Sequence, residues 1–125
     1  MPRIKSARQN ILSGVIKKPW GNYQILFTGE NFQVKRVELD PGGRLSLQRH
    51  QRRAEKWTVV CGAGTATVGK KKIKVRRESL VEIPVKKIHR LYNTGKAPLV
   101  VVEIQFGDYF GEDDITRLQD DFGRA

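Results

Sequence analysis

Cysteine is almost absent from this sequence, and long apolar runs are missing altogether. Cys61 is the only cysteine in 125 residues, which excludes an intramolecular disulfide and a zinc site built from several thiolates. It follows two valines, and we interpret it as a buried, inert thiol. No stretch approaches the roughly 20 apolar residues of a membrane-spanning helix, and no apolar secretory run follows the charged N-terminus. These absences predict a cytoplasmic protein.

Acidic residues are scarce relative to basic ones. Lysine and arginine number 24 against 13 for aspartate and glutamate, so the formal net charge is +11. A positive surface attracts anionic partners, including nucleic acid. The basic run from Lys70 to Arg77 is the best argument for nucleic acid, but no helix-turn-helix, zinc finger or aromatic RNA-binding pattern accompanies it. Such a run is also typical of a solvated sheet edge, so nucleic-acid binding is the lesser alternative.

The length fits a single domain, and the pattern from Trp20 onward predicts β structure. Short runs rich in β-formers alternate with turns that contain Gly, Pro or Asn. This pattern favours antiparallel connections and therefore an all-β, double-sheet barrel. The predicted strands are Gly21–Thr28, Phe32–Leu39, Arg44–Gln48, Glu55–Cys61, Gly64–Val68, Lys72–Arg76, Ser79–Ile83, His89–Tyr92 and Leu99–Phe106.

The chain ends are predicted to differ from the barrel, which we place at residues 18–110. Residues 1–17 are expected to form an N-terminal arm, in which Ile11, Leu12, Val15 and Ile16 are a short apolar set. Residues 111–125 are expected to form a C-terminal tail. Three acidic residues starting at Glu112 suit the beginning of a short helix in this tail.

Polar residues lie two apart in the strand predicted near His50. Because side chains alternate across a strand, one face is expected to be wholly polar, with Arg44, Ser46, Gln48 and His50. By the same rule Glu55 shares a face with Trp57, and Glu103 shares a face with Gln105. Polar faces that converge inside a barrel are costly unless a metal, a ligand or water satisfies them. The sequence therefore predicts an interior polar site.

His50 and His89 are the only two histidines. His50 lies two residues after Gln48, and His89 lies just after a predicted turn at residues 84–87. Imidazole, carboxylate and amide oxygen together suit Zn, Mn, Fe or Ni. A Gln-x-His pair alone is weak evidence, because a hydrogen-bonded structural histidine is the commoner case.

The wider spacing resembles the cupin family. Gly42-x5-Gln48-x-His50-x4-Glu55-x6-Gly62 is similar to the first cupin motif, with Gln in place of its first histidine. Pro84-x4-His89-x3-Asn93 is similar to the later part of the second motif. The sequence most resembles the C-terminal isomerase domain of type II phosphomannose isomerases, over residues 17–124. The runs that carry this resemblance are 18–21, 32–37, 45–48, 53–55, 89–91 with Asn93, and 111–115.

This resemblance implies a cupin-type jelly-roll barrel that holds a divalent metal ion (Zn, Mn, Fe, Ni or Co) on Gln48, His50, Glu55 and His89. It implies interconversion of mannose 6-phosphate and fructose 6-phosphate, and it suggests a homodimer. The guanylyltransferase domain to which such isomerase domains are often fused has no counterpart in these residues, so nucleotide-sugar synthesis is not expected. The alternative from another class is a metal- or sugar-binding cupin without catalysis.

Roles for other residues follow from the chemistry of an aldose–ketose isomerase, in which a proton moves between C1 and C2 of the sugar. The metal would stabilise the charge of an enediolate, and Arg or Lys side chains would bind the phosphate. Arg44 is the leading phosphate donor because it is expected on the ligand face. The weaker candidates are Lys35, Lys87, Arg90 and Arg124. The base stays open between Glu103, Lys35 and a metal-bound hydroxide.

Four positions depart from the family pattern. Arg52 and Lys56 stand where histidines are common, and Glu78 and Lys86 stand where the second motif has glycines. If Arg52, Lys56 and Lys86 fill the space that a substrate needs, the non-catalytic alternative is favoured.

Overall fold

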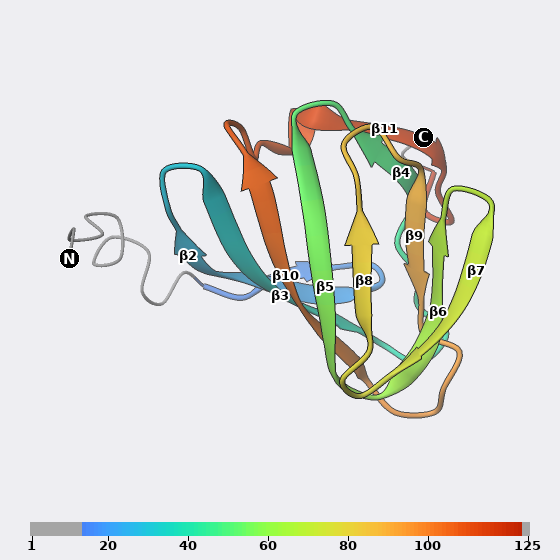
Figure 1. The fold of residues 1–125 in the computed structure, drawn as a ribbon. Coiled ribbons are helices and arrows are strands. Elements are labelled where there is room, and N and C mark those ends of the chain that lie inside the picture. Colours follow the sequence, from blue (N-terminus) through green and yellow to red (C-terminus); the bar gives the residue numbers. More distant parts are fainter. Residues whose placement is uncertain (1–13, 124–125) are drawn as a thin grey trace.

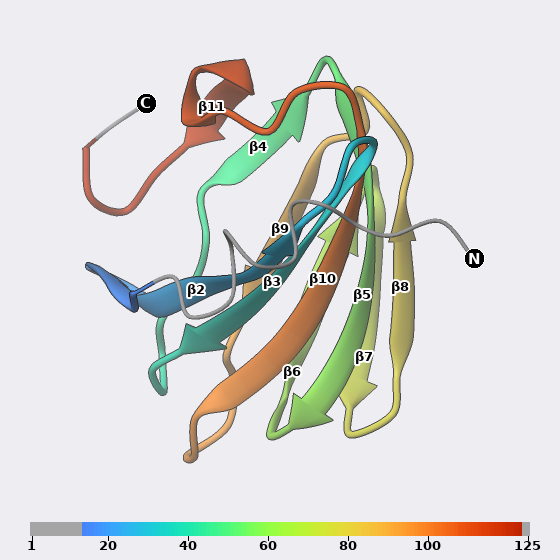
Figure 2. The same cartoon turned by 90° about the vertical axis from the view of Figure 1, so that its left-hand side faces the viewer.

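Two antiparallel sheets face each other in the computed structural model, which describes residues 14–123 (Figures 1 and 2). The first sheet has, in spatial order, β1 (Ile16–Lys18), β2 (Gly21–Thr28), β3 (Phe32–Leu39), β10 (Leu99–Gly107), β5 (Arg53–Cys61) and β8 (Leu80–Ile83). The second has β11 (Ile115–Gln119), β4 (Leu47–His50), β9 (His89–Tyr92), β6 (Ala63–Val68) and β7 (Lys71–Arg76). From β3 to β11 the chain crosses between the sheets at every connection except the β6–β7 hairpin, as in a jelly roll. The predicted all-β, cupin-type fold is confirmed.

β2, β3 and β9 have the predicted bounds, whereas the strand predicted at Arg44–Gln48 is observed as β4, Leu47–His50. β1 begins within the predicted arm and pairs with β2, while residues 1–13, including Ile11 and Leu12, lie outside the described residues. The predicted C-terminal helix is reduced to a 3-10 turn, Glu112–Asp114, followed by β11. The chain extends there because β11 pairs with the edge of β4, a long-range contact that local propensity does not show.

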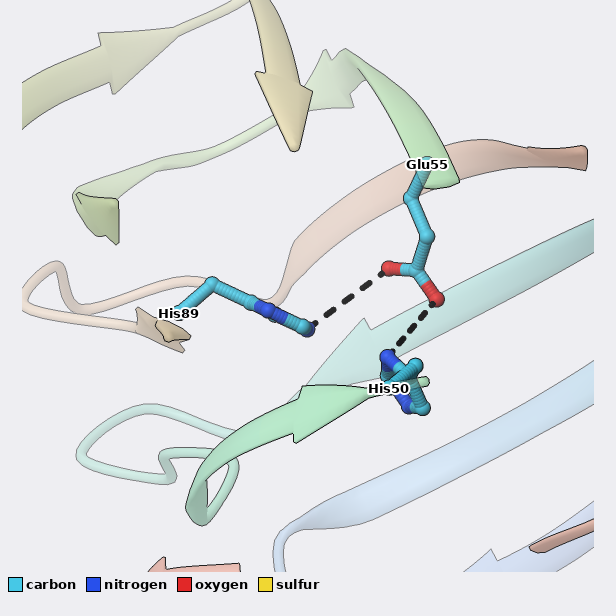
Figure 3. A group of neighbouring side chains, drawn as sticks. All are labelled: His50, Glu55 and His89. Atoms are coloured by element: carbon cyan, nitrogen blue, oxygen red, sulfur yellow. Dashed lines mark ion pairs between the residues drawn. The ribbon is translucent and has the colours of Figure 1, made fainter. Parts of the chain in front are cut away.

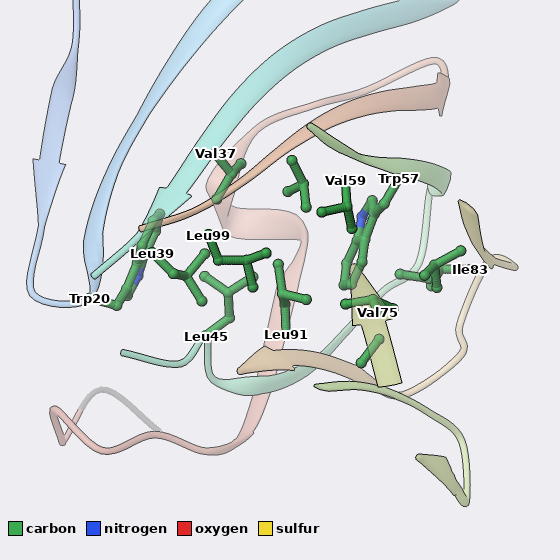
Figure 4. Close-up of a cluster of buried hydrophobic side chains, with 13 residues drawn as sticks. Trp20, Val37, Leu39, Leu45, Trp57, Val59, Val75, Ile83, Leu91 and Leu99 are labelled. Carbon is green, nitrogen blue, oxygen red and sulfur yellow. The ribbon is translucent and has the colours of Figure 1, made fainter. Parts of the chain in front are cut away.

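The interior is divided along the strands into an apolar end and a polar end. Inward positions of β3 run from Gln33 to Leu39, and those of β10 run in the opposite direction from Leu99 to Gln105. Because the two strands are antiparallel, their apolar positions pair with each other, as Val101 does with Val37. The apolar end holds the hydrophobic core (Figure 4). Its members are Trp20, Val37, Leu39, Leu45, Trp57, Val59, Ala66, Val75, Val81, Ile83, Leu91, Leu99 and Val101.

The prediction that Cys61 is buried is wrong. Cys61 is exposed at the end of β5. The register between β10 and β5 shifts there, so that Val101 pairs with Val59 and Val100 pairs with Cys61. The prediction depended on the two valines before Cys61, and a bulge of this kind interrupts the inward alternation of β5 just before that residue.

Helices contribute almost nothing to residues 14–123. A search of these residues found no helix with the length and apolar character that a membrane crossing demands.

Two loops carry the residues that replace the family's glycines. Glu78 has φ of 75° and Lys86 has φ of 68°, and within residues 14–123 they are the non-glycine residues with positive φ. The left-handed region costs a residue with a Cβ atom about 1–2 kcal/mol, which explains why glycine is usual at such positions. The chain adopts the left-handed backbone at both positions and accepts the strain.

Replacing Glu78 by glycine should therefore stabilise the protein. Relief of strain, about 1–2 kcal/mol, exceeds the backbone entropy that glycine loses on folding, about 0.5–1 kcal/mol. We expect Glu78→Gly to raise the free energy of unfolding by about 0.5 kcal/mol or slightly more, measured by urea denaturation. The control is Arg77→Gly in the same loop, where only the entropy loss applies and a decrease is expected. Equal decreases in both variants would contradict the prediction.

Candidate metal centre

Three buried side chains from three strands meet at the polar end of the interior (Figure 3). His50 ends β4, Glu55 lies near the start of β5, and His89 begins β9. Glu55 stands between the histidines, with Oε2 3.8 Å from His50 Nδ1 and Oε1 3.9 Å from His89 Nε2. These separations are too long for hydrogen bonds. They suit atoms that share an ion at about 2.0–2.2 Å from each ligand.

Both histidines have a buried nitrogen that lacks a hydrogen-bond partner. His50 Nε2 and His89 Nε2 make no hydrogen bond within the described residues. His89 Nδ1 lies 2.8 Å from the carbonyl oxygen of Lys87, so Nδ1 carries the proton and Nε2 presents its lone pair toward Glu55. Backbone contacts of this kind orient metal-binding histidines. Burial lowers the pKa of His50 to about 4, so its ring is neutral at pH 7 and can act as a ligand.

Hydrogen bonds hold the Glu55 carboxylate on both sides. Trp57 Nε1 donates to Oε1 at 2.9 Å, and Gln105 Nε2 donates to Oε2 at 3.0 Å. Gln105 accepts in turn from Gln33, and Gln33 accepts from Thr28. Burial opposes ionisation, but His89, His50 and Arg53 outweigh it and keep the pKa of Glu55 below its usual value. The carboxylate is therefore fixed in position and ionised, as a metal ligand must be.

A pocket opens against this cluster. Three of the four expected ligands line it, namely Gln48, His50 and Glu55, while His89 is 1% exposed. Gln48 is the direct cross-strand partner of His89. The residues thus fit a divalent cation, and the four-ligand set stays a prediction.

A family comparison agrees with this geometry. The sequence profile of the family described as "Mannose-6-phosphate isomerase C-terminal" matches residues 6–120. The chain belongs to this family. The resemblance found in the sequence is therefore confirmed.

Curated relatives of this isomerase-family domain are longer proteins. The alginate biosynthesis protein AlgA of Pseudomonas aeruginosa is 46% identical over 110 residues, which cover 88% of this chain and 23% of AlgA. A mannose-1-phosphate guanylyltransferase of Salmonella montevideo is 41% identical over 123 residues, which cover 98% of this chain and 26% of that protein. The chain spans about a quarter of the length of these relatives.

Solved structures support the fold. A cupin-2 domain from Rhodospirillum rubrum is 27% identical with a TM-score of 0.64, covering 74% of this chain and 67% of its own. Oxalate decarboxylase from Lactobacillus farciminis, solved as a formate complex, is 20% identical with a TM-score of 0.74, covering 84% and 33%. The latter likeness concerns the fold alone.

Further charged side chains of this family member line the pocket. The cations are Lys18, Lys35, Arg53 and Arg117, and the acids besides Glu55 are Glu103 and Glu112. Glu103 is 5% exposed and pairs across the sheet with Lys35. Burial, followed by the nearby charge of Glu55, raises the pKa of Glu103 to about 8. Glu103 and Lys35, the two candidate bases from this chain, therefore both face the pocket.

Arg44 lies elsewhere, contrary to the expectation that it shares the ligand face. Its guanidinium makes two hydrogen bonds of 2.6 Å to Asp121 and lies over the ring of Tyr92, and it does not line the pocket. The strand begins only at Leu47, and Arg44 forms an isolated bridge with Tyr92. Strict alternation therefore does not extend back to Arg44.

Most of the weaker phosphate candidates also lie outside the pocket lining. Arg90 donates to the carbonyl oxygen of Leu45 and to Gln119, and Lys87 contributes its carbonyl to His89. Arg124 lies outside the described residues. Among the predicted donors that fall within residues 14–123, only Lys35 lines the pocket.

Sequence reasoning missed two arginines that do line it. Arg53 is 3% exposed, and its Nε lies 3.5 Å from Glu55 Oε2. Arg117 pairs with Gln48 across β11 and β4, and its buried Nε has no hydrogen-bond partner within the described residues. If the strand predicted at Glu55–Cys61 had been started at Arg53, alternation would have placed Arg53 on the same face as Glu55. Arg117 gave no such signal, because its segment was predicted to be helical.

The departures from the family pattern lie outside the pocket. Arg52 pairs with Asp108 and lies over Tyr109, and Lys56 lies 3.9 Å from Glu82. Neither these two residues nor Lys86 line the pocket. Their side chains therefore do not narrow this pocket.

Metal binding should depend on the three clustered side chains. We expect the purified protein to bind one divalent ion, and Glu55→Gln to weaken that binding at least 100-fold, because the substitution removes the anionic ligand. Chelator competition with Zn²⁺ or Co²⁺ measures the affinity. The matched control is Glu82→Gln on the neighbouring strand, which is exposed and should bind as the wild type does. Equal affinities in all three proteins would contradict the predicted centre.

Proposed function

We propose that this chain is a metal-dependent aldose–ketose isomerase that interconverts mannose 6-phosphate and fructose 6-phosphate. The observation that carries the proposal is the buried cluster of His50, Glu55 and His89 against a cation-lined pocket. Family membership over residues 6–120 points to the same chemistry. The guanylyltransferase activity named for a relative is not proposed, because the chain matches only about a quarter of that protein.

A bound divalent cation would stabilise the negative charge that develops on the sugar oxygens as the proton leaves. The protein's own part is to fix the ligand side chains in place, with the histidines neutral and Glu55 ionised. Trp57 and Gln105 orient Glu55, and Lys87 sets the tautomer of His89. Pre-organised ligands of this kind need no rearrangement during the reaction.

The cations of the pocket suit the phosphate of the substrate. Arg53 is buried beside Glu55, and Arg117 and Lys35 approach from other elements. An arginine binds phosphate through two parallel hydrogen bonds, and these bonds are strengthened by its charge. We assign Arg117 and Lys35 to phosphate binding, because Arg53 already pairs with Glu55.

Glu103 is the best-placed proton carrier among the side chains of this chain. It lines the pocket, lies on the strand beside Glu55 and faces Lys35. A carboxyl whose pKa lies near the working pH both accepts and returns a proton readily. Its pKa of about 8 fits a residue that shuttles a proton between two sugar carbons.

Turnover is the direct test. We expect the metal-loaded protein to convert each sugar phosphate into the other, followed by a coupled assay or by NMR. Glu103→Gln should lower kcat about 10²–10⁴-fold and leave bound metal and KM nearly unchanged. Conversion of neither substrate by a protein that holds its metal would end the isomerase proposal and favour a non-catalytic metal- or sugar-binding cupin.

Loss of a phosphate donor should act on substrate binding. We expect Arg117→Met to raise KM about 10-fold, the equivalent of one charge-assisted hydrogen bond, with a smaller effect on kcat. Lys56→Met is the control, because it removes one positive charge outside the pocket. A similar KM increase in both variants would assign the effect to overall charge instead of to a contact by Arg117.

Two expectations from the sequence stay predictions. For the homodimer, the outward side of β10 exposes Ile104 and Phe106, 38% and 42% respectively, as interface patches often do. For nucleic acid, the basic residues of β7 are exposed along a sheet edge, which is also how a sheet avoids pairing with other chains. The second expectation remains the lesser alternative.

A further inference from the structure

The C-terminal segment from Gly111 to Gln119, called here the strap, lies beside β4 at the end of the sandwich where β4 ends in His50 (Figure 2). Its strand β11 runs antiparallel to β4, with Ile115 opposite His50 and Arg117 opposite Gln48. Ile115 and Arg117 also line the pocket. The strap is therefore a wall of the site, contributed by a part of the chain remote in sequence from the ligands.

Asp114 joins the strap to the backbone between two ligands. Its Oδ1 accepts a hydrogen bond from the amide of Gln51 at 3.1 Å, and its Oδ2 accepts one from the amide of Arg52 at 3.0 Å. Gln51 and Arg52 make up the whole connection between His50, which ends β4, and Arg53, which begins β5. Both carboxylate oxygens of Asp114 thus accept hydrogen bonds from the same two-residue turn.

This turn decides how His50 and Glu55 face each other. The other side of His50 is also held, because its carbonyl accepts a hydrogen bond from the amide of Lys86 at 2.8 Å. Hydrogen bonds from amides to a carboxylate are charge-assisted and stronger than neutral ones. A metal site loses affinity when its ligands are displaced by fractions of an ångström, so groups that fix the backbone of the ligands matter.

We propose that Asp114 is a positioning residue for the metal centre, clamping the β4–β5 turn so that His50 and Glu55 keep the separation that a divalent ion requires. The inference rests on the proposed metal centre and deepens it. Asp114 lies outside the lining of the pocket and acts through the backbone of the turn. A residue far along the chain from His50 and Glu55 thus controls the affinity of the site for the metal ion.

The neighbouring carboxylate provides a matched control. Asp113 lies one residue earlier in the same 3-10 turn and accepts a hydrogen bond from the hydroxyl of Tyr109. Asp113→Asn removes the same charge from the same segment but leaves the clamp in place. Asp114→Asn keeps the side-chain shape but turns one of the two acceptors into a donor that faces an amide.

Metal affinity, measured with Zn²⁺ by chelator competition, separates the variants. We expect Asp114→Asn to bind Zn²⁺ about 10–100-fold more weakly than the wild type, as changes outside the ligand set do, and Asp113→Asn to bind within about twofold. Hydrogen exchange of the Gln51 and Arg52 amides in the metal-free proteins should accelerate in Asp114→Asn alone. If Asp114→Asn does not fold, Asp114→Glu carries the test, since it retains the charge and displaces the oxygens.

The outcomes distinguish the two proposals. Tight Zn²⁺ binding by the wild type together with equal affinity in Asp114→Asn would overturn the positioning role and leave the metal centre intact. Equal losses in Asp113→Asn and Asp114→Asn would also overturn it, because they indicate a charge effect. Wild-type protein that binds no Zn²⁺, Co²⁺ or Mn²⁺ would overturn the centre itself, and the positioning role with it.

Discussion

The carboxylate of Glu55, buried to 3% exposure between two histidines, is the group on which the rest of the interior depends. An ionised carboxylate in a dry interior is very costly unless it is paired and hydrogen-bonded. Trp57, Gln105 and Arg53 meet part of this requirement. His89 Nε2, which faces Glu55, has no hydrogen-bond partner within the described residues. A cation beside Glu55 would satisfy the carboxylate and His89 Nε2 together, and His50 would reach it through Nδ1, the nitrogen nearer Glu55.

The two-sheet architecture makes such a site possible because the inward face of each sheet is apolar at one end and polar at the other. The apolar end of β3, β5 and β10 buries Leu39, Val59 and Val101 almost completely, and each such side chain contributes about 1.5–3 kcal/mol. The same strands then carry polar residues inward at the other end, where the strap Gly111–Gln119 contributes a wall. Strands rigidly packed at one end can hold ligands from β4, β5 and β9 at the other with little freedom to move.

Sequence reasoning succeeded where local rules govern and failed where distant segments meet. Motif spacing singled out His50, Glu55 and His89, which the structure brings together, and strand alternation placed Glu103 and Gln105 inward. Alternation misled at Arg44, where the chain is not yet a strand, and the apolar run misled at Cys61, where a bulge intervenes. β11 was missed because its extended form depends on pairing with β4, some seventy residues away in the chain, and Arg117 was missed with it.

The four positions that depart from the pattern of the sequence resemblance lie outside the pocket lining. Arg52 and Lys56 replace histidines, yet both side chains point away from the pocket and pair with acids at the surface. Glu78 and Lys86 replace glycines and keep the left-handed backbone at the cost of strain. The backbone amide of Arg52 donates a hydrogen bond to Asp114, and this contact does not involve the Arg52 side chain. The side chains at these positions thus stay outside the pocket, while the backbone of the turn after His50 is held by Asp114.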